Sequence, residues 1–448
     1  MATDATLNAT DLQNLLASGT VRVTTTGSGV QADNIRVKAP FSWSSASVLT
    51  LDAYRSIAIE DSVSITGPGG LTLATNDGNP RGALSFGSRG DVTFANLSAS
   101  LEVNGVSYTL VNTIKLLADA IAANPSGAYA LADDYDGSAD GTYRSSPVGT
   151  GVAGIVEGLG HTISHVTIDA SGFFAYVQAS GSVRDIRLTN TSVHTSSVGT
   201  GAGGLVAENS GNLSGDAVFV HLLAGGSNSY VGALTGMNLG TITASSARGT
   251  IKSVGPGNGV GGLVGYNAGT ISLSSATNSI EQSYGSASLG GLVSANETSG
   301  IITQSFATGA VRGGNVAGGL VSVIYAGEVE DSYSIGTPIG SSLIAGGFAG
   351  IDDSIVTKSY STGTPNAGGY FGGFIGYNDT RENRLCYWDI STSNVANGVG
   401  HGSNRGVVGL TTTQLQNGLP VGFSSKIWAE SSNVNGGLPY LVNNPPPK

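Results

Sequence analysis

Short runs in which apolar and polar residues alternate fill the first hundred positions of the chain. They include VRVTTT from Val21, IRVKA from Ile35, VLTLDA from Val48, IAIED from Ile57 and VSITG from Val63. Each run places two apolar side chains on one face with a polar one between them, the period-two pattern of a half-buried strand. Because Gly, Asn, Asp and Ser punctuate the runs, we expect short strands joined by tight turns.

A nine-residue word, GGLVGYNAG at residues 261–269, returns with small changes through the second half of the chain. Its apolar anchors are Leu205, Leu234, Leu263, Leu292, Leu320, Phe348 and Phe374. Successive anchors are 29, 29, 29, 28, 28 and 26 residues apart, a period that indicates a solenoid or repeat array. An antiparallel sandwich or barrel does not need an identical apolar position at constant spacing. We therefore predict a parallel β-helix of about three short strands per coil, with the anchors in one internal ladder.

The polar part of the word predicts how each coil turns. Two adjacent glycines permit backbone angles closed to other residues and let a corner approach the next coil. An asparagine follows in several copies, where it suits a left-handed corner and can form a ladder with its equivalents. These asparagines are Asn209, Asn238, Asn267, Asn296 and Asn378. We expect the word to fold the chain rather than to carry chemistry.

Two helices are expected outside this pattern. Ile114, Leu117 and Ile121 have helical spacing, with Thr113 as N-cap and Pro125 ending the run, so a helix of about ten residues should interrupt the coils. Residues 10–17, TDLQNLLA, predict a shorter helical turn that covers the first coil.

The repeat lapses near Asn383, and the last coil needs a cover because an exposed coil end is a sheet edge. Trp388, Trp428 and Tyr440 can supply the apolar bulk of such a cap. The prediction is an all-β protein with four segments: N-terminal coils at 1–112, a helix-containing insertion at 113–145, the repeat array at 146–382 and a closing segment at 383–448.

Composition narrows the function. The net charge of -11, with scattered acidic residues, argues against a nucleic-acid partner. One cysteine, Cys386, excludes an internal disulfide framework. The start, MATDATLNATDL, has no basic or apolar signal region. A cytoplasmic protein and a segment of a longer exported precursor both fit; richness in Ser, Thr, Asn and Gly favours the exported segment.

The repeats resemble the GLUG motif of large bacterial surface proteins. The stretch YTLVNTIKLLADAIAANPSGAYALADDYD, followed by VEGLGHTISHVTI, is similar to the block that precedes such arrays in filamentous-haemagglutinin-like adhesins. The ending YWDISTSN to GGLPYLV is similar to the way these arrays close. The resemblance implies a right-handed parallel β-helix, two-partner secretion with an outer-membrane partner, and a role in adhesion or biofilm. Neither the family's secretion domain nor an anchor is visible, so we expect an interior or C-terminal segment.

Candidate chemistry is sparse. The glycine-rich stretches lack the Lys-Ser/Thr of a phosphate loop, and His161 and His165 stand in a strand-like context, so we expect neither a cofactor nor a metal. Parallel β-helices can carry polysaccharide hydrolases or lyases that use carboxylates from adjacent coils. The candidates for that alternative are Glu328, Glu330, Asp352, Asp353, Asp379 and Glu382. The favoured interpretation of these residues is a row of solvated turn residues.

Aromatic residues gather late in the chain. Tyr333 and Tyr360 lie in repeated strands and are expected inside. Tyr325, Tyr370 and Trp388 fall in irregular stretches near acidic residues and Arg381, and these four are the predicted ligand-binding residues; they fit a cap over the final coils as well. We predict a monomeric, secreted or surface-exposed adhesin segment that binds glycans or host or abiotic surfaces. A carbohydrate-active enzyme and a purely structural stalk are the alternatives.

Overall fold

The structure, a computed structural model, describes residues 5–25, 32–77, 82–196, 198–227, 229–283, 286–339, 343–379 and 383–447. Within these ranges short strands dominate, and most of them pair in parallel with the equivalent strand of the next coil. The predicted parallel β-helix is therefore confirmed. By their contacts the residues divide into a first unit (Met1–Asp136, Val152–Ser164, Gly181–Arg187) and a second unit (Gly137–Gly151, His165–Ser180, Leu188–Lys448), a different division from the four predicted segments.

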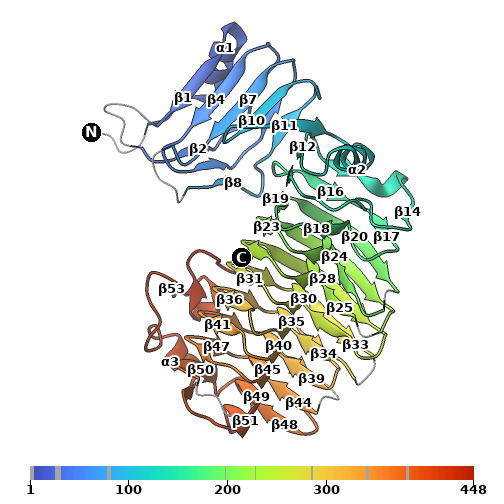
Figure 1. Ribbon diagram of the computed structural model, residues 1–448. Coiled ribbons are helices and arrows are strands. Elements are labelled where there is room, and N and C mark those ends of the chain that lie inside the picture. Colours follow the sequence, from blue (N-terminus) through green and yellow to red (C-terminus); the bar gives the residue numbers. More distant parts are fainter. Residues whose placement is uncertain are drawn as a thin grey trace. The chain divides into compact units, whose positions relative to one another are not determined.

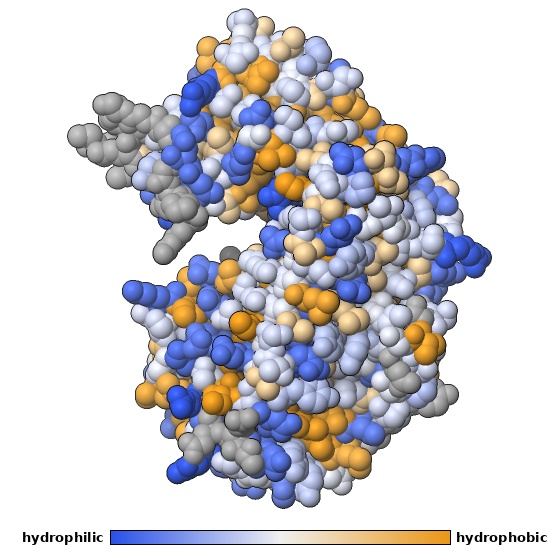
Figure 2. Space-filling model, viewed as in Figure 1, coloured by the Kyte–Doolittle hydropathy of each residue, from blue (hydrophilic) through white to orange (hydrophobic). Residues whose placement is uncertain are grey.

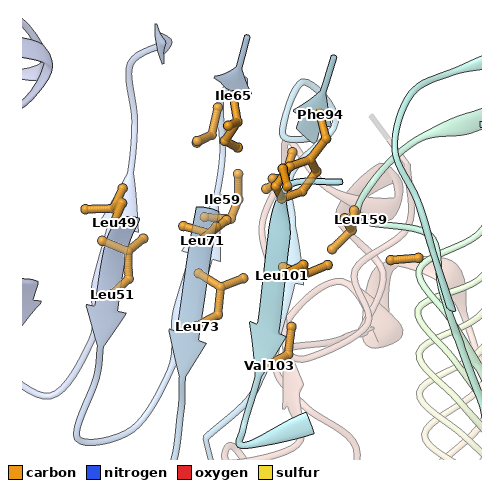
Figure 3. Packing of buried hydrophobic residues seen from close by; sticks show 14 of the residues in the cluster. Leu49, Leu51, Ile59, Ile65, Leu71, Leu73, Phe94, Leu101, Val103 and Leu159 are labelled. Carbon is orange, nitrogen blue, oxygen red and sulfur yellow. The ribbon is translucent and has the colours of Figure 1, made fainter. Parts of the chain in front are cut away.

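The N-terminal coils of the first unit have three walls (Figure 1). The strands are β1 (Val21–Thr24), β4 (Val48–Asp52), β7 (Gly70–Ala74) and β10 (Ser100–Val103); β2 (Ile35–Val37), β5 (Ile57–Ile59) and β8 (Leu84–Phe86); and β3 (Phe41–Trp43), β6 (Val63–Ile65) and β9 (Val92–Phe94). In-register pairing aligns Leu49 with Leu71 and Leu101, so equivalent leucines form interior rows (Figure 3). Helix α1 (Ala9–Ser18) buries Leu12 and Leu16 and packs beside β3.

A hairpin interrupts the parallel order where none was predicted. β10 pairs in antiparallel fashion with β11 (Val106–Val111) through Asn104 and Gly105, which have φ of 51° and 78°. An Asn-Gly pair is the preferred sequence for such a two-residue turn, and it was overlooked because the parallel pattern continues on both sides. The predicted helix follows as α2 (Ile114–Ala123), with the Thr113 hydroxyl accepting the Leu116 amide.

Beyond α2 the first unit returns to parallel pairing. Its remaining strands are β12 (Ala128–Leu131), β13 (Tyr135–Asp136), β15 (Ile155–Glu157), β16 (Thr162–Ser164) and β19 (Ser182–Arg184).

Coils of the second unit have four walls, one more than predicted. One wall holds β23 (Asn212–Ser214), β27 (Thr241–Thr243), β31 (Thr270–Ser272), β36 (Ile301–Thr303), β41 (Glu328–Glu330) and β46 (Val356–Thr357). The next holds β14 (Thr142–Tyr143), β17 (Thr167–Ile168), β20 (Arg187–Thr195), β24 (Ala217–Ala224), β28 (Ser246–Ser253), β32 (Ser275–Ala276), β33 (Ser279–Gln282), β37 (Phe306–Ala307), β38 (Val311–Arg312), β42 (Tyr333–Ser334), β43 (Pro338–Ile339), β47 (Tyr360–Ser361), β50 (Cys386–Asp389) and β52 (Val407–Leu410).

The other two walls arise from the repeated word itself, which splits into two strands at its anchor residue. The seven-stranded sheet is β21 (Gly201–Gly203), β25 (Tyr230–Gly232), β29 (Gly259–Gly261), β34 (Ser288–Gly290), β39 (Val316–Gly318), β44 (Ile344–Gly346) and β48 (Tyr370–Gly372). The nine-stranded sheet is β18 (Phe174–Val177), β22 (Val206–Asn209), β26 (Thr235–Asn238), β30 (Val264–Asn267), β35 (Val293–Asn296), β40 (Val321–Ile324), β45 (Ala349–Asp352), β49 (Ile375–Asn378) and β51 (Val399–Gly402).

The glycine pairs serve close approach and not unusual backbone angles. Gly261 and Gly262 do not have positive φ, so the expectation of special angles is wrong. A Cβ on Gly261 would lie 1.8 Å from the carbonyl oxygen of Val264, and one on Gly262 would lie 1.9 Å from that of Gly291. The two glycine positions therefore let the backbone fold tightly onto itself and onto the next coil. The anchor that follows, Leu263, is fully buried, and its backbone amide donates to the carbonyl oxygen of Leu292, the anchor of the next coil. The anchors therefore form the predicted interior ladder.

Four of the five asparagines form the predicted ladder, but none forms the predicted corner. Asn378 is outside the ladder, because Ile324 and Asp352 occupy the column between it and Asn296. The Nδ2 of Asn209 donates to the Oδ1 of Asn238 (2.8 Å), and the bond repeats from Asn238 to Asn267 (2.8 Å) and from Asn267 to Asn296 (2.7 Å). The left-handed corner lies elsewhere, in a column of unrelated residues: Gly215, Ala244, Leu273, Gln304, Asp331, Lys358 and Leu385. Pairing with both neighbouring coils holds this corner, so its residue type is free to vary.

A serine ladder adjoins that corner and explains the cysteine. Each backbone amide donates to the hydroxyl of the next coil, from Asp216 through Ser245, Ser274, Ser305 and Ser332 to Ser359. Cys386, which is fully buried, is the next residue of this column. Its thiol points at the carbonyl oxygen of Arg384, two residues back, as each serine hydroxyl does.

The β-helix continues past Asn383, where the closing segment was expected to begin. β50, β51 and β52 pair with the preceding coil although the repeated word is gone. Trp388 lies inside this coil, because a Cβ on Gly373 would lie 2.1 Å from its ring. The equivalent interior residues of earlier coils, Ser334 and Ser361, are small. Trp388 therefore fills the interior of the last coil, which supports the predicted capping role.

Residues 411–447, named here the C-terminal strap, lie along one wall of the second unit. The strap contains α3 (Thr412–Leu415), β53 (Trp428–Ala429) and β54 (Tyr440–Leu441). It covers a stack of outward-facing rings, Phe306, Tyr333, Tyr360 and Tyr387. Trp428 packs on the rings of Tyr333 and Tyr360 and donates to the Asp331 carboxylate at 2.9 Å. Tyr333 and Tyr360 are thus buried as expected, but beneath the strap and not inside the coil.

Candidate functional site

Of the carboxylates proposed for catalysis, Asp353 and Asp379 lie at one corner of successive coils, whereas Glu328, Glu330 and Asp352 lie elsewhere. Glu328 and Glu330 extend from β41, and Glu330 pairs with Lys358 at 2.6 Å. Asp352 ends β45 in the nine-stranded sheet and is fully buried, where it accepts the Ser354 amide at 3.0 Å. Its column is that of the asparagine ladder, so its role is to fold the coil. This interior position argues against its expected place on an outer face.

Two further acidic candidates, Asp353 and Asp379, do lie together with aromatic residues. Each follows the last residue of a strand in the nine-stranded sheet, at the same corner of successive coils. Glu297 and Tyr325 occupy this corner in the two preceding coils. The column therefore reads Glu297, Tyr325, Asp353, Asp379, with neighbouring members about 4.8 Å apart along the axis. Glu382 and Arg381 lie outside the described residues.

Aromatic rings gather beside this column in two groups. Tyr230 and Tyr266 form the first group, named here the N-terminal station, with ring centroids 4.8 Å apart. Tyr370, Tyr377 and His401 form the second, the C-terminal station, with centroid separations of 5.8 Å (Tyr370–Tyr377), 4.6 Å (Tyr370–His401) and 5.0 Å (Tyr377–His401). The two stations and the corner column together are named the tyrosine strip.

Alternation along the strands explains why these rings face outward. In GYN, the word shared by β30 and β49, the asparagine points into the coil, so the tyrosine before it points out. The seven-stranded sheet contributes Tyr230 and Tyr370 at equivalent positions of its strands.

Between the two stations the seven-stranded sheet becomes apolar toward Tyr370, beside the acidic corner column. The strand positions equivalent to Tyr230 in the next coils are, in order, Gly259, Ser288, Val316, Ile344 and Tyr370. The side chains of Val316 and Ile344 lie over the backbone of Gly350 and Gly376. Figure 2 shows hydrophobic surface over β44 and β45 in this stretch.

Exposure separates the predicted ligand-binding residues. Tyr325 is 48% exposed and Tyr370 is 46% exposed, so both rings present a face to solvent. Trp388 is only 5% exposed because it lies inside the last coil, so its expected place in an exposed groove is wrong.

Nearby carboxylates raise the pKa of tyrosines in the strip. Partial burial, followed by the negative charges of Glu297 and Asp353, raises the pKa of Tyr325 above its usual value. The Asp379 carboxylate, the nearest charge, raises the pKa of Tyr377. The phenols therefore stay protonated and can act as hydrogen-bond donors, with carboxylate acceptors beside them.

Sequence reasoning missed Tyr230, Tyr266, Tyr377, His401 and Glu297. One signal was present: GYN occurs in two copies of the repeated word, and Glu297 follows a ladder asparagine directly. The alternation that turns the ladder asparagine inward also turns the residues on either side of it outward, so the same word encodes both the fold and the strip.

The described carboxyl groups whose pKa burial raises most lie in the first unit. Burial raises the pKa of Glu157 to about 7, against the opposing effect of Arg184, and raises that of Asp185 well above its usual value. The two carboxyl groups share a hydrogen bond, and Arg184 donates to the Tyr108 hydroxyl at 2.6 Å. Glu157 is 1% exposed, so this cluster is closed to a substrate.

His161 is also engaged. One ring nitrogen is 2.8 Å from the carbonyl oxygen of Val92, and the other is 3.3 Å from the Asp134 carboxylate. Among the described residues no group of three or more His, Cys, Asp or Glu side chains is arranged to hold a metal ion.

No protein-family description matches the chain, and no curated protein matches it. A solved chain named IgA1 protease is similar to it, with 21% sequence identity and a TM-score of 0.42. The alignment covers 54% of this chain and 21% of that one, so this chain matches about a fifth of the other's length. At this level the similarity carries no information about activity. No helix among the described residues is long and apolar enough to cross a membrane.

Proposed function

We propose that this chain is a non-enzymatic segment of a secreted bacterial surface adhesin that binds glycans through the tyrosine strip. The observation that carries the proposal is that the tyrosines of the two stations face outward from the seven-stranded and nine-stranded sheets. The opposite face of each sheet lines the interior of the coil. Sugars bind to aromatic faces flanked by hydrogen-bonding groups, and the strip has both. A rigid β-helix holds such groups at little entropic cost on binding.

The family resemblance supplies the cellular setting of the proposal. GLUG-like repeats are similar to those of adhesins exported by two-partner secretion, so we place the segment on or outside the bacterial surface. An outer-membrane secretion partner belongs to this proposal on the same basis. The rival function, a polysaccharide hydrolase or lyase, keeps one pair of neighbouring candidates, Asp353 and Asp379. It is less well supported because the other described candidates lie away from that pair: Glu328 and Glu330 on β41, and Asp352 in the interior.

A glycan screen that records both binding and cleavage tests the proposal. We expect binding to at least one polysaccharide without release of reducing ends or unsaturated products. Tyr325→Ala and Tyr370→Ala should each weaken binding about tenfold or more, as for exposed tyrosines at binding hot spots. Tyr54→Ala is the matched control, because Tyr54 is a 39% exposed tyrosine of the first unit. Its binding and melting temperature should match the unmodified protein.

The results separate the alternatives. Turnover abolished by Asp353→Asn would establish the enzyme and end the adhesin proposal. Failure to bind any glycan or surface would leave the structural stalk.

A further inference from the structure

The two aromatic stations lie along the β-helix axis at a defined separation. Tyr266 is on β30 and Tyr377 on β49, and the nine-stranded sheet runs β30-β35-β40-β45-β49 between them. Four strand spacings of about 4.8 Å give about 19 Å. In-register pairing at every step fixes this separation.

The backbone positions between the stations repeat at each strand. Every step adds one residue of the corner column, where Tyr325 stands between Glu297 and Asp353. The sheet positions between Tyr266 and Tyr377 are instead apolar: Ala295 and Val323, which are buried, and the half-buried Ile351. One sugar unit of an extended, unbranched polysaccharide has nearly the length of one strand spacing. A chain lying parallel to the axis therefore meets one corner residue, a carboxylate or a tyrosine, at each unit from Glu297 to Asp379.

Charge selects among such chains. The described charged groups of the corner column are the carboxylates of Glu297, Asp353 and Asp379. Ligand carboxylates or sulfates placed beside them would suffer like-charge repulsion in a partly desolvated site. Neutral sugar hydroxyls instead find carboxylate acceptors and phenol donors.

We propose that the tyrosine strip binds an unbranched glycan without acidic groups, extended along the β-helix axis, with one sugar on each station. About five units are needed to reach both stations at the spacing of the strands. This inference rests on the proposed function and adds the ligand's charge, direction and minimum length.

The geometry predicts a length threshold. A short oligosaccharide occupies one station, whereas one that reaches both binds the second station as an intramolecular step at high effective concentration. Affinity should therefore rise steeply between the disaccharide and about the pentasaccharide and then level off, by a factor on the order of a hundred.

Isothermal titration calorimetry with the full chain tests the length threshold and the charge preference. The neutral ligands are cello- and chito-oligosaccharides from the disaccharide to the hexasaccharide, and oligogalacturonates of the same lengths are the acidic probes. Tyr266→Ala and Tyr370→Ala remove one station each. Each variant should lose the gain at long lengths, by about tenfold or more, and keep the disaccharide affinity of the remaining station. Tyr54→Ala and the melting temperature of each variant control for folding.

The outcomes distinguish this inference from the function on which it rests. Binding of long glycans that depends on Tyr325 but shows no length threshold, or tighter binding of oligogalacturonates, overturns the inference and leaves the glycan-binding function intact. Absence of binding to every oligosaccharide and polysaccharide, or binding that none of the strip variants changes, overturns both.

Discussion

Replacing Asn267 by alanine tests whether the asparagine ladder stabilises the coils. Asn267 accepts from the amide of Asn238 at 2.8 Å and donates to Asn296 at 2.7 Å, and all three side chains are fully buried. Its amide also reaches the carbonyl oxygen of Gly269 at 3.2 Å. The substitution therefore removes the partner of two buried polar groups, one on each neighbouring coil.

The expected loss follows from these contacts. A buried polar group left without its partner costs about 1–3 kcal/mol. The Asn238 side chain keeps a weaker hydrogen bond to the carbonyl oxygen of Gly240 at 3.3 Å, so the loss at Asn238 falls at the lower end of that range. We expect Asn267→Ala to lower the free energy of unfolding by about 2–4 kcal/mol.

Urea titration followed by circular dichroism measures this change, with Asn212→Ala as the matched control, because Asn212 lies exposed at the start of β23. The control should stay within about 0.5 kcal/mol of the unmodified protein. A natural comparison exists in the chain, since Ile324 occupies the ladder position after Asn296. Asn296→Ala should cost less than Asn267→Ala, because Asn296 has a ladder partner on one side only. If Asn267→Ala proves as harmless as the control, the ladder contributes no net stability and the reasoning is refuted.

Four further substitutions examine other parts of the structure. Gly261→Ala should lower the free energy of unfolding by about 1–3 kcal/mol or more, because the new Cβ would lie 1.8 Å from a backbone oxygen. Gly262→Ala should lower it less, since Ala233 occupies the second glycine position in another copy of the word. Equal melting temperatures of the two variants would contradict this difference. Cys386→Ser should change the free energy of unfolding by less than about 1 kcal/mol, because serines fill the same column in the preceding coils. The native thiol should react slowly with Ellman's reagent, since burial raises its pKa. Burial raises the pKa of Glu157 to about 7, so the folded state keeps a proton that the unfolded state releases above about pH 4.5. The free energy of unfolding should therefore fall as the pH rises from about 4.5 to 7, and Glu157→Gln should flatten that slope in urea titrations at several pH values. An unchanged slope would assign the pH dependence to other groups.

The fold was predictable from the sequence because it is periodic. A coil must place the same kind of side chain at the same depth each time round, so the anchor from Leu205 to Phe374 and the asparagines after it appear as spacings before any contact is known. Helix α2 was equally visible, because its cap at Thr113 and the spacing from Ile114 to Ile121 are local features.

What is not periodic was decided by tertiary structure. The left-handed corner is occupied by residues as different as Ala244, Leu273 and Lys358, because pairing with neighbouring coils sets the backbone there whatever the side chain. The position of Trp388 inside the last coil and the packing of Trp428 on Tyr360 join segments that no repeat connects.

The candidate site shows the same division. Tyr325 and Tyr370 stood out as aromatic residues in irregular stretches, but Tyr266 was hidden within a word whose asparagine serves the fold. Period-two alternation turns one of two adjacent residues inward and the other outward, so a folding motif and a surface feature are encoded together. The sequence by itself determined that the chain coils and with what period. Only the pairing of strands from different coils decided which outward residues meet to form a continuous strip.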